Sequence, residues 1–234
     1  VVTGPPGRGK STYLSYLTTK LDESKLPYIR HHYFLSIDDK TGDRFSHFTV
    51  QNDLKYQLES FHGAGGNSLA EAMQTCAKHY AIEGKPLVVL IDGLDHVWRD
   101  NNEDINPLDS LFNMLLPPID NVIYIIGTQP VEDKKLPKKL VQFKRRDSWL
   151  TLPPLTGNAI LKFIEGQAEK GRLQLKCHNE REHECLSESA EALLELTLGH
   201  PLSIIYVIEQ ISSTKTPISA YEINKLPKIF GEHI

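Results

Sequence analysis

The sequence predicts an α/β protein: a parallel sheet flanked by helices, followed by a small all-helical domain. Three observations predict this fold. The glycine-rich stretch Gly4–Ser11 follows two valines and opens a helical pattern. The apolar runs Leu87–Ile91 and Val122–Ile126 are typical of parallel strands that are buried on both faces. From Thr156 onward, apolar residues recur at helical spacing and no further strand signal follows.

The stretch Gly4–Ser11 reads GPPGRGKS and matches the P-loop pattern G-x-x-x-x-G-K-[ST] without a mismatch. Its glycines let backbone N–H groups converge on phosphate oxygens. Lys10 would contact the β- and γ-phosphates, and Ser11 would offer its hydroxyl to Mg²⁺. The alternative is a Gly/Pro turn without a ligand, but the position between a strand and a helix N-terminus favours an anion site. The loop residues predicted to bind the nucleotide are Gly4, Pro5, Pro6, Gly7, Arg8, Gly9, Lys10, Ser11 and Thr12.

A strand and two helices are predicted between this loop and the next apolar run. The strand covers Tyr28–Ile37, and the helices cover Ser46–Phe61 and Leu69–Glu83. A long helical crossover of this kind suits a doubly wound sheet. His31 and His32 lie inside the predicted strand, where adjacent side chains point to opposite faces. We therefore interpret them as ordinary strand histidines and not as ligands of a shared metal.

The run Leu87–Ile91 ends in the acidic sequence DGLD. In an open α/β sheet, ligands bind beyond the carboxyl ends of the strands. Asp92 therefore stands where a P-loop protein needs a carboxylate for Mg²⁺, directly or through water. Asp95 is a candidate to orient or deprotonate the attacking water, and the alternative is a turn or helix-capping residue. The predicted catalytic residues are Lys10, Asp92 and Asp95.

A helix over Leu108–Leu115 and the strand Val122–Ile126 follow, and the strand leads into the sequence GTQP. If this strand lies beside the first one, Thr128 and Gln129 lie next to the P-loop. Their polar side chains would then sense the γ-phosphate. The alternative is that this sequence only begins a loop, and the residues leave the choice open.

Seven basic residues cluster before the last predicted strand, Trp149–Leu152: Lys134, Lys135, Lys138, Lys139, Lys144, Arg145 and Arg146. The simplest interpretation is a solvated face. A second one places Arg145 or Arg146 within reach of a neighbouring subunit's nucleotide, as an arginine finger. A nucleic-acid surface is a third, although few aromatic residues interleave the cluster to stack on bases.

The strand Trp149–Leu152 and the following prolines mark a domain boundary. We predict a nucleotide-binding core over residues 1–154, a helical domain over 155–213 and a linker over 214–234. In the helical domain, Ser187 or Ser189 is predicted to cap a helix. The turn Gly199–Leu202 ends that helix, and its functional interpretation places it over an adenine.

Composition limits the class of protein. Of the 234 residues, 40% are hydrophobic. The net charge of −4 gives no general reason to expect binding to nucleic acid. No apolar run approaches the roughly 20 residues of a membrane helix. Three cysteines, Cys76, Cys177 and Cys185, argue for a reducing, cytoplasmic compartment. Since Val1 is not an initiator residue, we expect a fragment of a longer polypeptide.

The order of these motifs resembles the STAND class of P-loop NTPases, and most of all its NACHT-type members, over nearly the whole chain. Gly4–Thr12 match the phosphate loop of that class, Asp92 and Asp95 its acidic strand end, and Pro201 its adenine-side proline. The resemblance implies an AAA+-like core with the sheet order 5-1-4-3-2. It also implies a small helical domain and then a winged helix, toward which residues 214–234 would lead.

The resemblance further implies a function. Members of the class bind ATP or ADP with Mg²⁺, and their nucleotide state controls homo-oligomerisation and effector activation. They act in immune signalling and in antiviral defence, including bacterial defence. The trigger, expected to be a protein, would be sensed by a region outside this fragment. An AAA+ ATPase that acts on nucleic acid is the alternative function.

Two departures from the family pattern concern hydrolysis. Gln129 stands where the family often has arginine, and a neutral amide cannot supply that charge to a γ-phosphate. His96 stands where many relatives have glutamate. Both changes lower the expected rate of hydrolysis more than the expected affinity for nucleotide, so we expect a slow ATPase.

Overall fold

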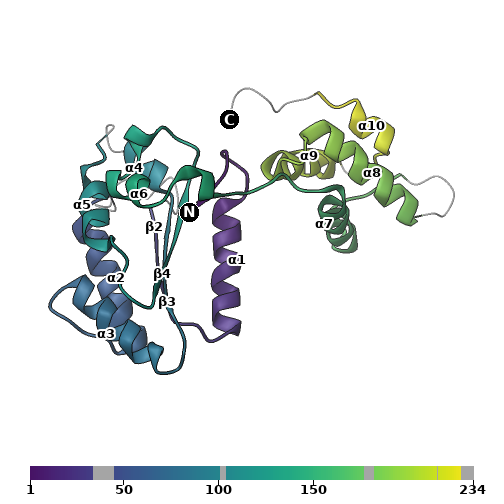
Figure 1. The fold of residues 1–234 in the computed structure, drawn as a ribbon. Helices are drawn as coiled ribbons and strands as arrows, with labels where there is room; N and C mark the ends of the chain where they lie inside the picture. Colours follow the sequence, from purple (N-terminus) through teal and green to yellow (C-terminus); the bar gives the residue numbers. More distant parts are fainter. Residues whose placement is uncertain (34–44, 101–103, 177–181, 215, 228–234) are drawn as a thin grey trace. The chain divides into compact units, whose positions relative to one another are not determined.

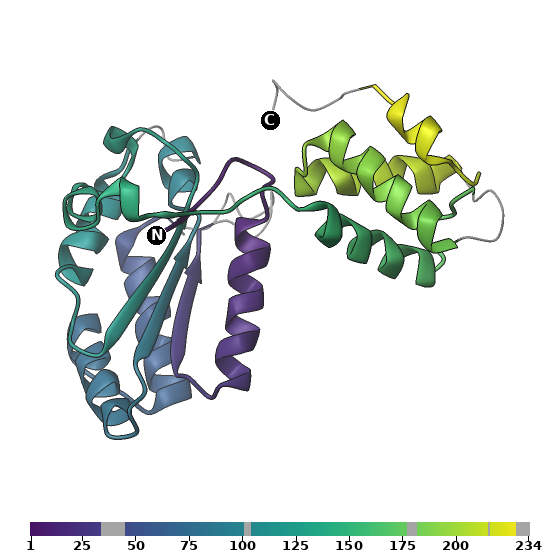
Figure 2. The ribbon, with the colours of Figure 1, turned by 45° about the vertical axis from the view of Figure 1, so that its right-hand side comes forward.

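The computed structural model describes residues 1–33, 45–100, 104–176, 182–214 and 216–227. The chain forms two compact units, which Figures 1 and 2 show as ribbons. The first unit comprises Val1–Pro5 and Lys10–Leu152, and the second comprises Pro6–Gly9 and Pro153–Ile234. The tip of the glycine-rich loop is thus grouped with the second unit.

The first unit is built on a five-stranded sheet. Its strands are β1 (Val2–Thr3), β2 (Tyr28–His32), β3 (Leu87–Asp92), β4 (Val122–Thr128) and β5 (Leu150–Thr151). They lie in the order β2-β3-β4-β1-β5, and every neighbouring pair is parallel. Read from the other edge, this is the order 5-1-4-3-2. The predicted fold class and strand order are therefore confirmed.

Helices cover both faces of this sheet (Figure 1). They are α1 (Lys10–Glu23), α2 (His47–His62), α3 (Leu69–Ala81), α4 (Leu94–Asp100), α5 (Asn106–Leu115) and α6 (Lys138–Phe143), with short 3-10 turns η2 (Asp133–Lys135) and η3 (Arg146–Ser148). Helix α1 lies on one side of the sheet, and α2, α3 and α5 lie on the other (Figures 1 and 2). The short helices α4 and α6 were not predicted, because seven and six residues give too little periodicity.

Strand β3 shows why the sheet is buried on both faces. All six of its residues are buried. Val89 and Ile91 face the larger core under α2, α3 and α5, whereas Leu90 packs with Leu14 of α1. The continuous apolar run is therefore the expected alternation of a strand with helices on both sides.

The edge of the sheet at β2 is closed by a side chain. Gln57 of α2 accepts a hydrogen bond from Arg30 N at 2.9 Å and donates one to Arg30 O at 2.8 Å. An exposed edge strand is a template for pairing with another chain. Gln57 satisfies this part of the edge within the unit.

The second unit is helical. It contains α7 (Gly157–Glu169), α8 (Glu182–Thr197), α9 (Pro201–Thr214) and α10 (Ala220–Asn224). Its own core includes Ile160, Ile164, Leu193, Ile204 and Ile208.

The predicted caps at Ser187 and Ser189 are wrong. Helix α8 is already formed at Glu182, so both serines lie inside it, and Ser189 is fully buried. The charged residues before Leu186 hid the earlier helical turns from a pattern that relies on apolar periodicity.

Some sequence predictions fall outside the described residues. These are the part of the predicted strand beyond Tyr33 and the end of the predicted linker at 228–234. Among the described residues, no helix combines the length and apolarity that crossing a bilayer requires.

Candidate functional site

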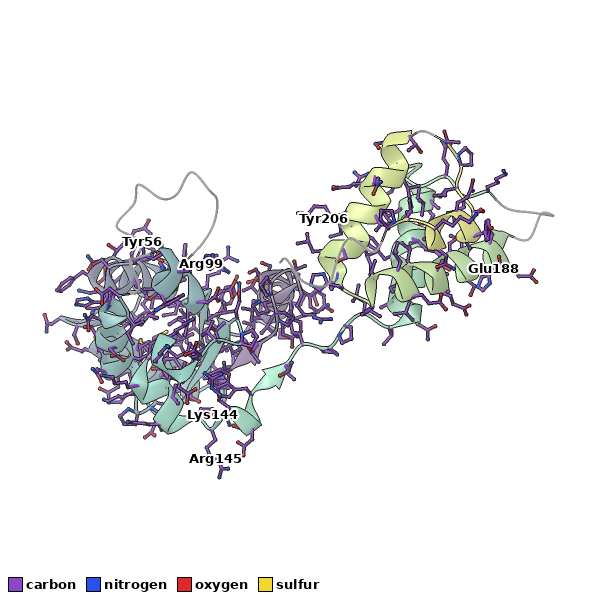
Figure 3. All side chains as sticks on the ribbon, turned by 90° about the horizontal axis from the view of Figure 1, so that it is seen from above. Tyr56, Arg99, Lys144, Arg145, Glu188 and Tyr206 are labelled. Atoms are coloured by element: carbon purple, nitrogen blue, oxygen red, sulfur yellow. The ribbon has the colours of Figure 1, made fainter. Side chains whose placement is uncertain are left out.

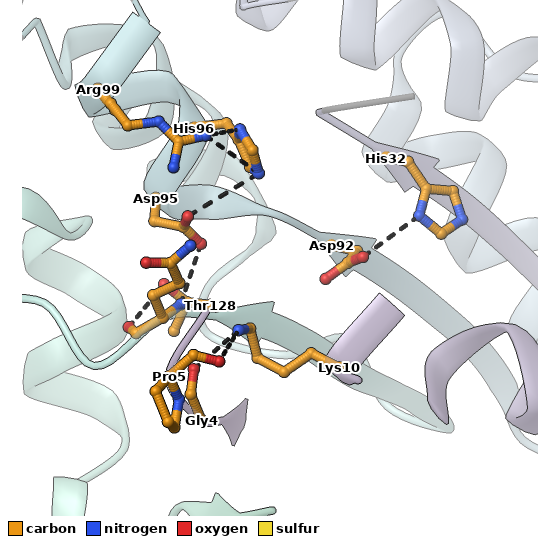
Figure 4. Close-up of polar contacts among 10 residues, drawn as sticks. Gly4, Pro5, Lys10, His32, Asp92, Asp95, His96, Arg99 and Thr128 are labelled. Atoms are coloured by element: carbon orange, nitrogen blue, oxygen red, sulfur yellow. Dashed lines mark hydrogen bonds and ion pairs between the residues drawn. The ribbon is translucent and has the colours of Figure 1, made fainter. Parts of the chain in front are cut away.

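Lys10 opens α1 directly after the glycine-rich loop. Its ammonium donates hydrogen bonds to the carbonyl oxygens of Gly4 at 2.7 Å and Pro5 at 3.2 Å (Figure 4). Burial lowers the pKa of Lys10, and the carboxylates of Asp95 and Asp92 oppose that shift. The ammonium is therefore held by loop carbonyls and lies in the field of two acidic groups. A phosphate oxygen could replace those carbonyls as its partner.

Asp92 is the last residue of β3 and is 5% exposed. Burial alone would raise the pKa of its carboxyl group. Hydrogen bonds from His32 and Ser11, together with the charges of His32 and Lys10, outweigh burial and hold the pKa below its usual value. The group is thus an anion at neutral pH although it is almost wholly buried.

The donor set at this place fits Mg²⁺. The hydroxyl of Ser11 is near enough to the carboxylate of Asp92 to help lower its pKa, so the two oxygen ligands lie in the same neighbourhood. Hard divalent cations prefer oxygen ligands, and Mg²⁺ is usually held by one or two protein oxygens plus substrate phosphates. Ser11 and Asp92 would hold the ion, which would neutralise charge on the phosphate oxygens.

Asp95 lies in the first turn of α4 and is 5% exposed. Its Oδ1 accepts a hydrogen bond at 3.0 Å from the backbone N–H of Gln129, which follows β4 (Figure 4). Its Oδ2 is buried and has no hydrogen-bond partner among the described residues, and His96 Nε2 lies 3.9 Å away. One oxygen therefore ties α4 to the end of β4. The other remains able to accept a proton or a water hydrogen.

Thr128 and Gln129 follow the central part of the sheet. Strand β4 pairs with β1, with Thr128 opposite Thr3, so the end of β4 lies beside the start of the phosphate loop, as expected. The side chain of Thr128 is fully buried and donates to the carbonyl oxygen of Gln129 at 3.2 Å. The backbone N–H of Gln129 donates its hydrogen bond to Asp95 and not to Asp92. Sensing of the γ-phosphate by the two side chains stays a prediction.

A NACHT domain model matches residues 1–169. The chain belongs to the NACHT domain family. Comparison with curated protein sequences found no match. Support for a nucleotide site in this NACHT domain therefore comes from its membership of a family of P-loop nucleotide-binding domains and from the geometry of the site itself.

Solved structures show the same fold at low sequence identity. The Aeropyrum pernix ORC2 protein, solved with ADPNP and ADP, is 12% identical, with a TM-score of 0.51 over 96% of this chain and 59% of its own. Cdc6p from Pyrobaculum aerophilum is 14% identical, with a TM-score of 0.50 over 92% of this chain and 56% of its own. The NACHT chain spans less than two thirds of either protein. At this identity the likeness shows the fold alone.

The remaining loop residues of the NACHT domain lie in the second unit. Gly7 and Gly9 have positive φ, as a tight phosphate loop requires. Arg8 has two guanidinium nitrogens that are buried without a hydrogen-bond partner in the described part of the chain. His200 Nε2 lies 2.9 Å from Pro6 O. Pro201 is the first residue of α9.

Thr12, the last predicted loop residue, is exposed in the first turn of α1. The sequence gives it no stronger signal than its place after Ser11. Its role in binding stays a prediction, as do those of the other loop residues.

Two residues beside Asp92 gave no signal in the sequence. The Nδ1 of His32 lies 3.5 Å from Asp92 Oδ2 (Figure 4), and Gly127 of β4 is in register with Asp92. His31 points elsewhere, with its Nδ1 2.8 Å from Asp53 Oδ2. The opposite faces of the two histidines were predicted correctly. The register that sets His32 against Asp92 could not be read from the sequence.

The basic cluster is largely paired within the first unit. Lys134 and Lys135 contact Glu132 at 2.7 and 3.6 Å, and the Lys135 ammonium lies 3.9 Å from the centre of the Trp98 ring. Lys139 donates to two backbone carbonyls.

The two arginines of the cluster differ. Arg146 bonds Asp133 and the carbonyl oxygen of Val131. Arg145 is 85% exposed, contacts Asp147 at 3.0 Å and projects outward in Figure 3. Of the two, Arg145 has the side chain that reaches into solvent.

Proposed function

We propose that this NACHT chain is the nucleotide-binding part of an ATP-dependent molecular switch, and that it hydrolyses ATP slowly. The observation that carries the proposal is the convergence of Lys10, Ser11 and Asp92 where α1 begins and β3 ends. The ammonium, the hydroxyl and the ionised carboxylate form the set that a magnesium-bound triphosphate needs.

Lys10 would exchange its two carbonyl partners for phosphate oxygens. Its burial supports this role, since an ammonium with a lowered pKa gains more from a nearby anion than an exposed one does. Ser11 and Asp92 would hold Mg²⁺, which would offset the charge of the phosphates. Asp95 would orient or deprotonate the attacking water through its Oδ2, which has no hydrogen-bond partner among the described residues.

Two residues support a switch over rapid turnover. Gln129 is neutral and offers its backbone to Asp95, and His96 replaces an acid found in many relatives. Slow hydrolysis would let each nucleotide state persist. A switch then requires that ATP and ADP bind two arrangements of the protein unequally. The γ-phosphate, read near Lys10 and Thr128, would be the discriminator.

The biological setting is the finer part of the proposal. Nucleotide exchange would favour association of copies of this chain and so bring effectors together, in immune or antiviral defence. A trigger acting on a region outside residues 1–234 would start the exchange. The family membership supports this setting by analogy.

The test is the nucleotide content of the purified protein, released by heat and resolved by ion-exchange chromatography. Near-stoichiometric ADP is expected, because a switch would hold its product. Lys10→Ala should lose nucleotide binding. Lys20→Ala, at the other end of the same helix, is the matched control and should bind as the parent does. Unchanged ATP affinity in Lys10→Ala would refute the assignment.

An ATPase that acts on nucleic acid would behave differently. It would show substantial steady-state turnover that DNA or RNA stimulates, and the turnover would depend on the basic cluster. The pairing of Lys134, Lys135 and Arg146 with acidic or backbone groups disfavours such a surface. Turnover with and without nucleic acid separates the two functions. Arg145→Ala, measured in the same assay, tests an arginine finger.

A further inference from the structure

The carboxylate of Asp92 lies in a row of three residues that crosses three strands. His32 of β2 is in register with Asp92 of β3, and Asp92 is in register with Gly127 of β4. Residues in register on neighbouring parallel strands project to the same face of the sheet. His32 and Gly127 therefore flank the acid on its two sides.

Gly127 leaves the space that the carboxylate uses. A Cβ added at Gly127 would overlap Asp92 Oδ1 and would lie 2.7 Å from Leu14 Cδ1. The φ of Gly127 lies outside the left-handed region, so its backbone conformation does not require glycine. Space is thus the reason for a glycine at this point of a strand, where glycine otherwise weakens the sheet.

His32 distinguishes the two oxygens of the acid. Its Nδ1 lies 3.5 Å from Asp92 Oδ2, within the distance of an ion pair when the imidazole is protonated. Oδ1 lies over Gly127. Oδ2 faces His32 of β2 and Oδ1 occupies the space left free at Gly127 of β4, and this arrangement favours one orientation of the carboxylate about its Cβ–Cγ bond.

We propose that His32 and Gly127 are positioning residues that orient Asp92 toward the Mg²⁺ of a bound nucleotide. The proposal rests on the proposed function for the identity of the ion, and on the row of three residues for the orientation. Neither residue contacts the reacting atoms. Groups that orient a metal ligand commonly change metal affinity by about 10- to 100-fold when removed.

The first experiment measures binding of a fluorescent ATP analogue to the whole chain, in EDTA and across a Mg²⁺ titration. His32→Ala and Gly127→Ala should raise the Mg²⁺ concentration at half-effect by about tenfold. Binding in EDTA should stay within about twofold, because the loop that holds the phosphates is unchanged. His32→Asn, which keeps a neutral donor, should recover part of the Mg²⁺ response.

Matched controls come from the same unit. An added Cβ at Gly65 meets no atom within 4 Å, and His79 is exposed on α3. Gly65→Ala and His79→Ala should leave the Mg²⁺ response as in the parent. A parent-like response in both His32→Ala and Gly127→Ala would overturn the proposal. A parent that binds no nucleotide would refute the proposed function instead.

The second experiment does not depend on nucleotide and allows for a variant that folds poorly. The melting temperature is compared for the parent, Gly127→Ala, Asp92→Ala and the double variant. If Gly127 makes room for the acid, removing the carboxylate should relieve the overlap, and the double variant should melt well above the additive expectation. Strict additivity would mean that the glycine leaves space for Leu14 and not for the carboxylate of Asp92, and would overturn the spatial argument.

Discussion

The structural role of Asp95 and its proposed catalytic role can be separated by replacing the residue with alanine and with asparagine. The carboxylate is 5% exposed, and its Oδ1 accepts the backbone N–H of Gln129 at 3.0 Å. A hydrogen bond to a charged group contributes about 1.5–3 kcal/mol, and a buried N–H left without a partner costs a similar amount. In the described part of the chain Oδ2 is buried without a hydrogen-bond partner, and removing it offsets part of this cost.

We therefore expect Asp95→Ala to lower the free energy of unfolding by about 2 kcal/mol. For a chain of this size, that corresponds to a melting temperature lower by about 4–8 °C. Asp95→Asn keeps an oxygen acceptor for Gln129 and should lose less than about 1 kcal/mol. Asparagine cannot take up a proton, so single-turnover ATP hydrolysis should fall by about 100-fold or more in both variants.

Thermal unfolding without nucleotide and single-turnover hydrolysis are measured on the same preparations. The exposed residue Asp120, replaced by alanine, is the control and should change neither quantity. A melting temperature of Asp95→Ala equal to that of the parent would refute the link between α4 and β4. Parent-like hydrolysis by Asp95→Asn would leave Asp95 with the structural role alone.

Three further predictions follow from burial and pairing. The folded state holds the pKa of Asp92 low, so the ionised carboxylate stabilises the fold fully above about pH 4 and loses this effect as the pH falls through its pKa in the folded state. In EDTA, urea unfolding of Asp92→Asn should lack this part of the destabilisation that acid causes in the parent. Parallel curves of unfolding free energy against pH for the two proteins would contradict the prediction. Burial raises the pKa of the Cys76 thiol to about 11. Alkylation of Cys76 near pH 8, followed peptide by peptide, should therefore be roughly 100-fold slower in the folded chain than in the urea-unfolded chain. Equal rates in the two states would disprove the prediction. Gln57→Ala removes the hydrogen-bond partner of the N–H and carbonyl of Arg30 at the edge of β2. The variant should therefore lower the free energy of unfolding by about 1 kcal/mol and self-associate in size-exclusion chromatography. An unchanged elution volume and melting temperature would show that Gln57 does not protect the edge.

Residue spacing along the chain was enough to predict the parts of this NACHT domain that are locally encoded. The P-loop at Gly4–Ser11 needs particular residues at fixed intervals, and the strand ending in Asp92 needs a continuous apolar run. Such signals can be recognised without knowing which other segments of the chain pack against them. The fold class was predicted for the same reason, whereas the strand order was implied only by the resemblance to the NACHT-type members of the STAND class.

Local patterns misled where burial came from other elements. Ser187 and Ser189 looked like caps because serine favours helix starts, but α8 begins earlier and Ser189 is buried within it. The basic cluster looked like one charged surface, and the fold pairs Lys134 with Glu132 and Arg146 with Asp133. Sequence spacing does not say which side chains a fold will bring together.

The contacts of Asp92 and Asp95 depend on the tertiary structure and could not be predicted from residue spacing. His32 and Gly127 are distant from Asp92 in the chain and meet it through strand register, which sets His32 beside one oxygen and leaves space for the other. Asp95 meets Gln129 because β4 lies next to β3. Each contact joins segments separated by more than thirty residues, so it exists only once the sheet has formed.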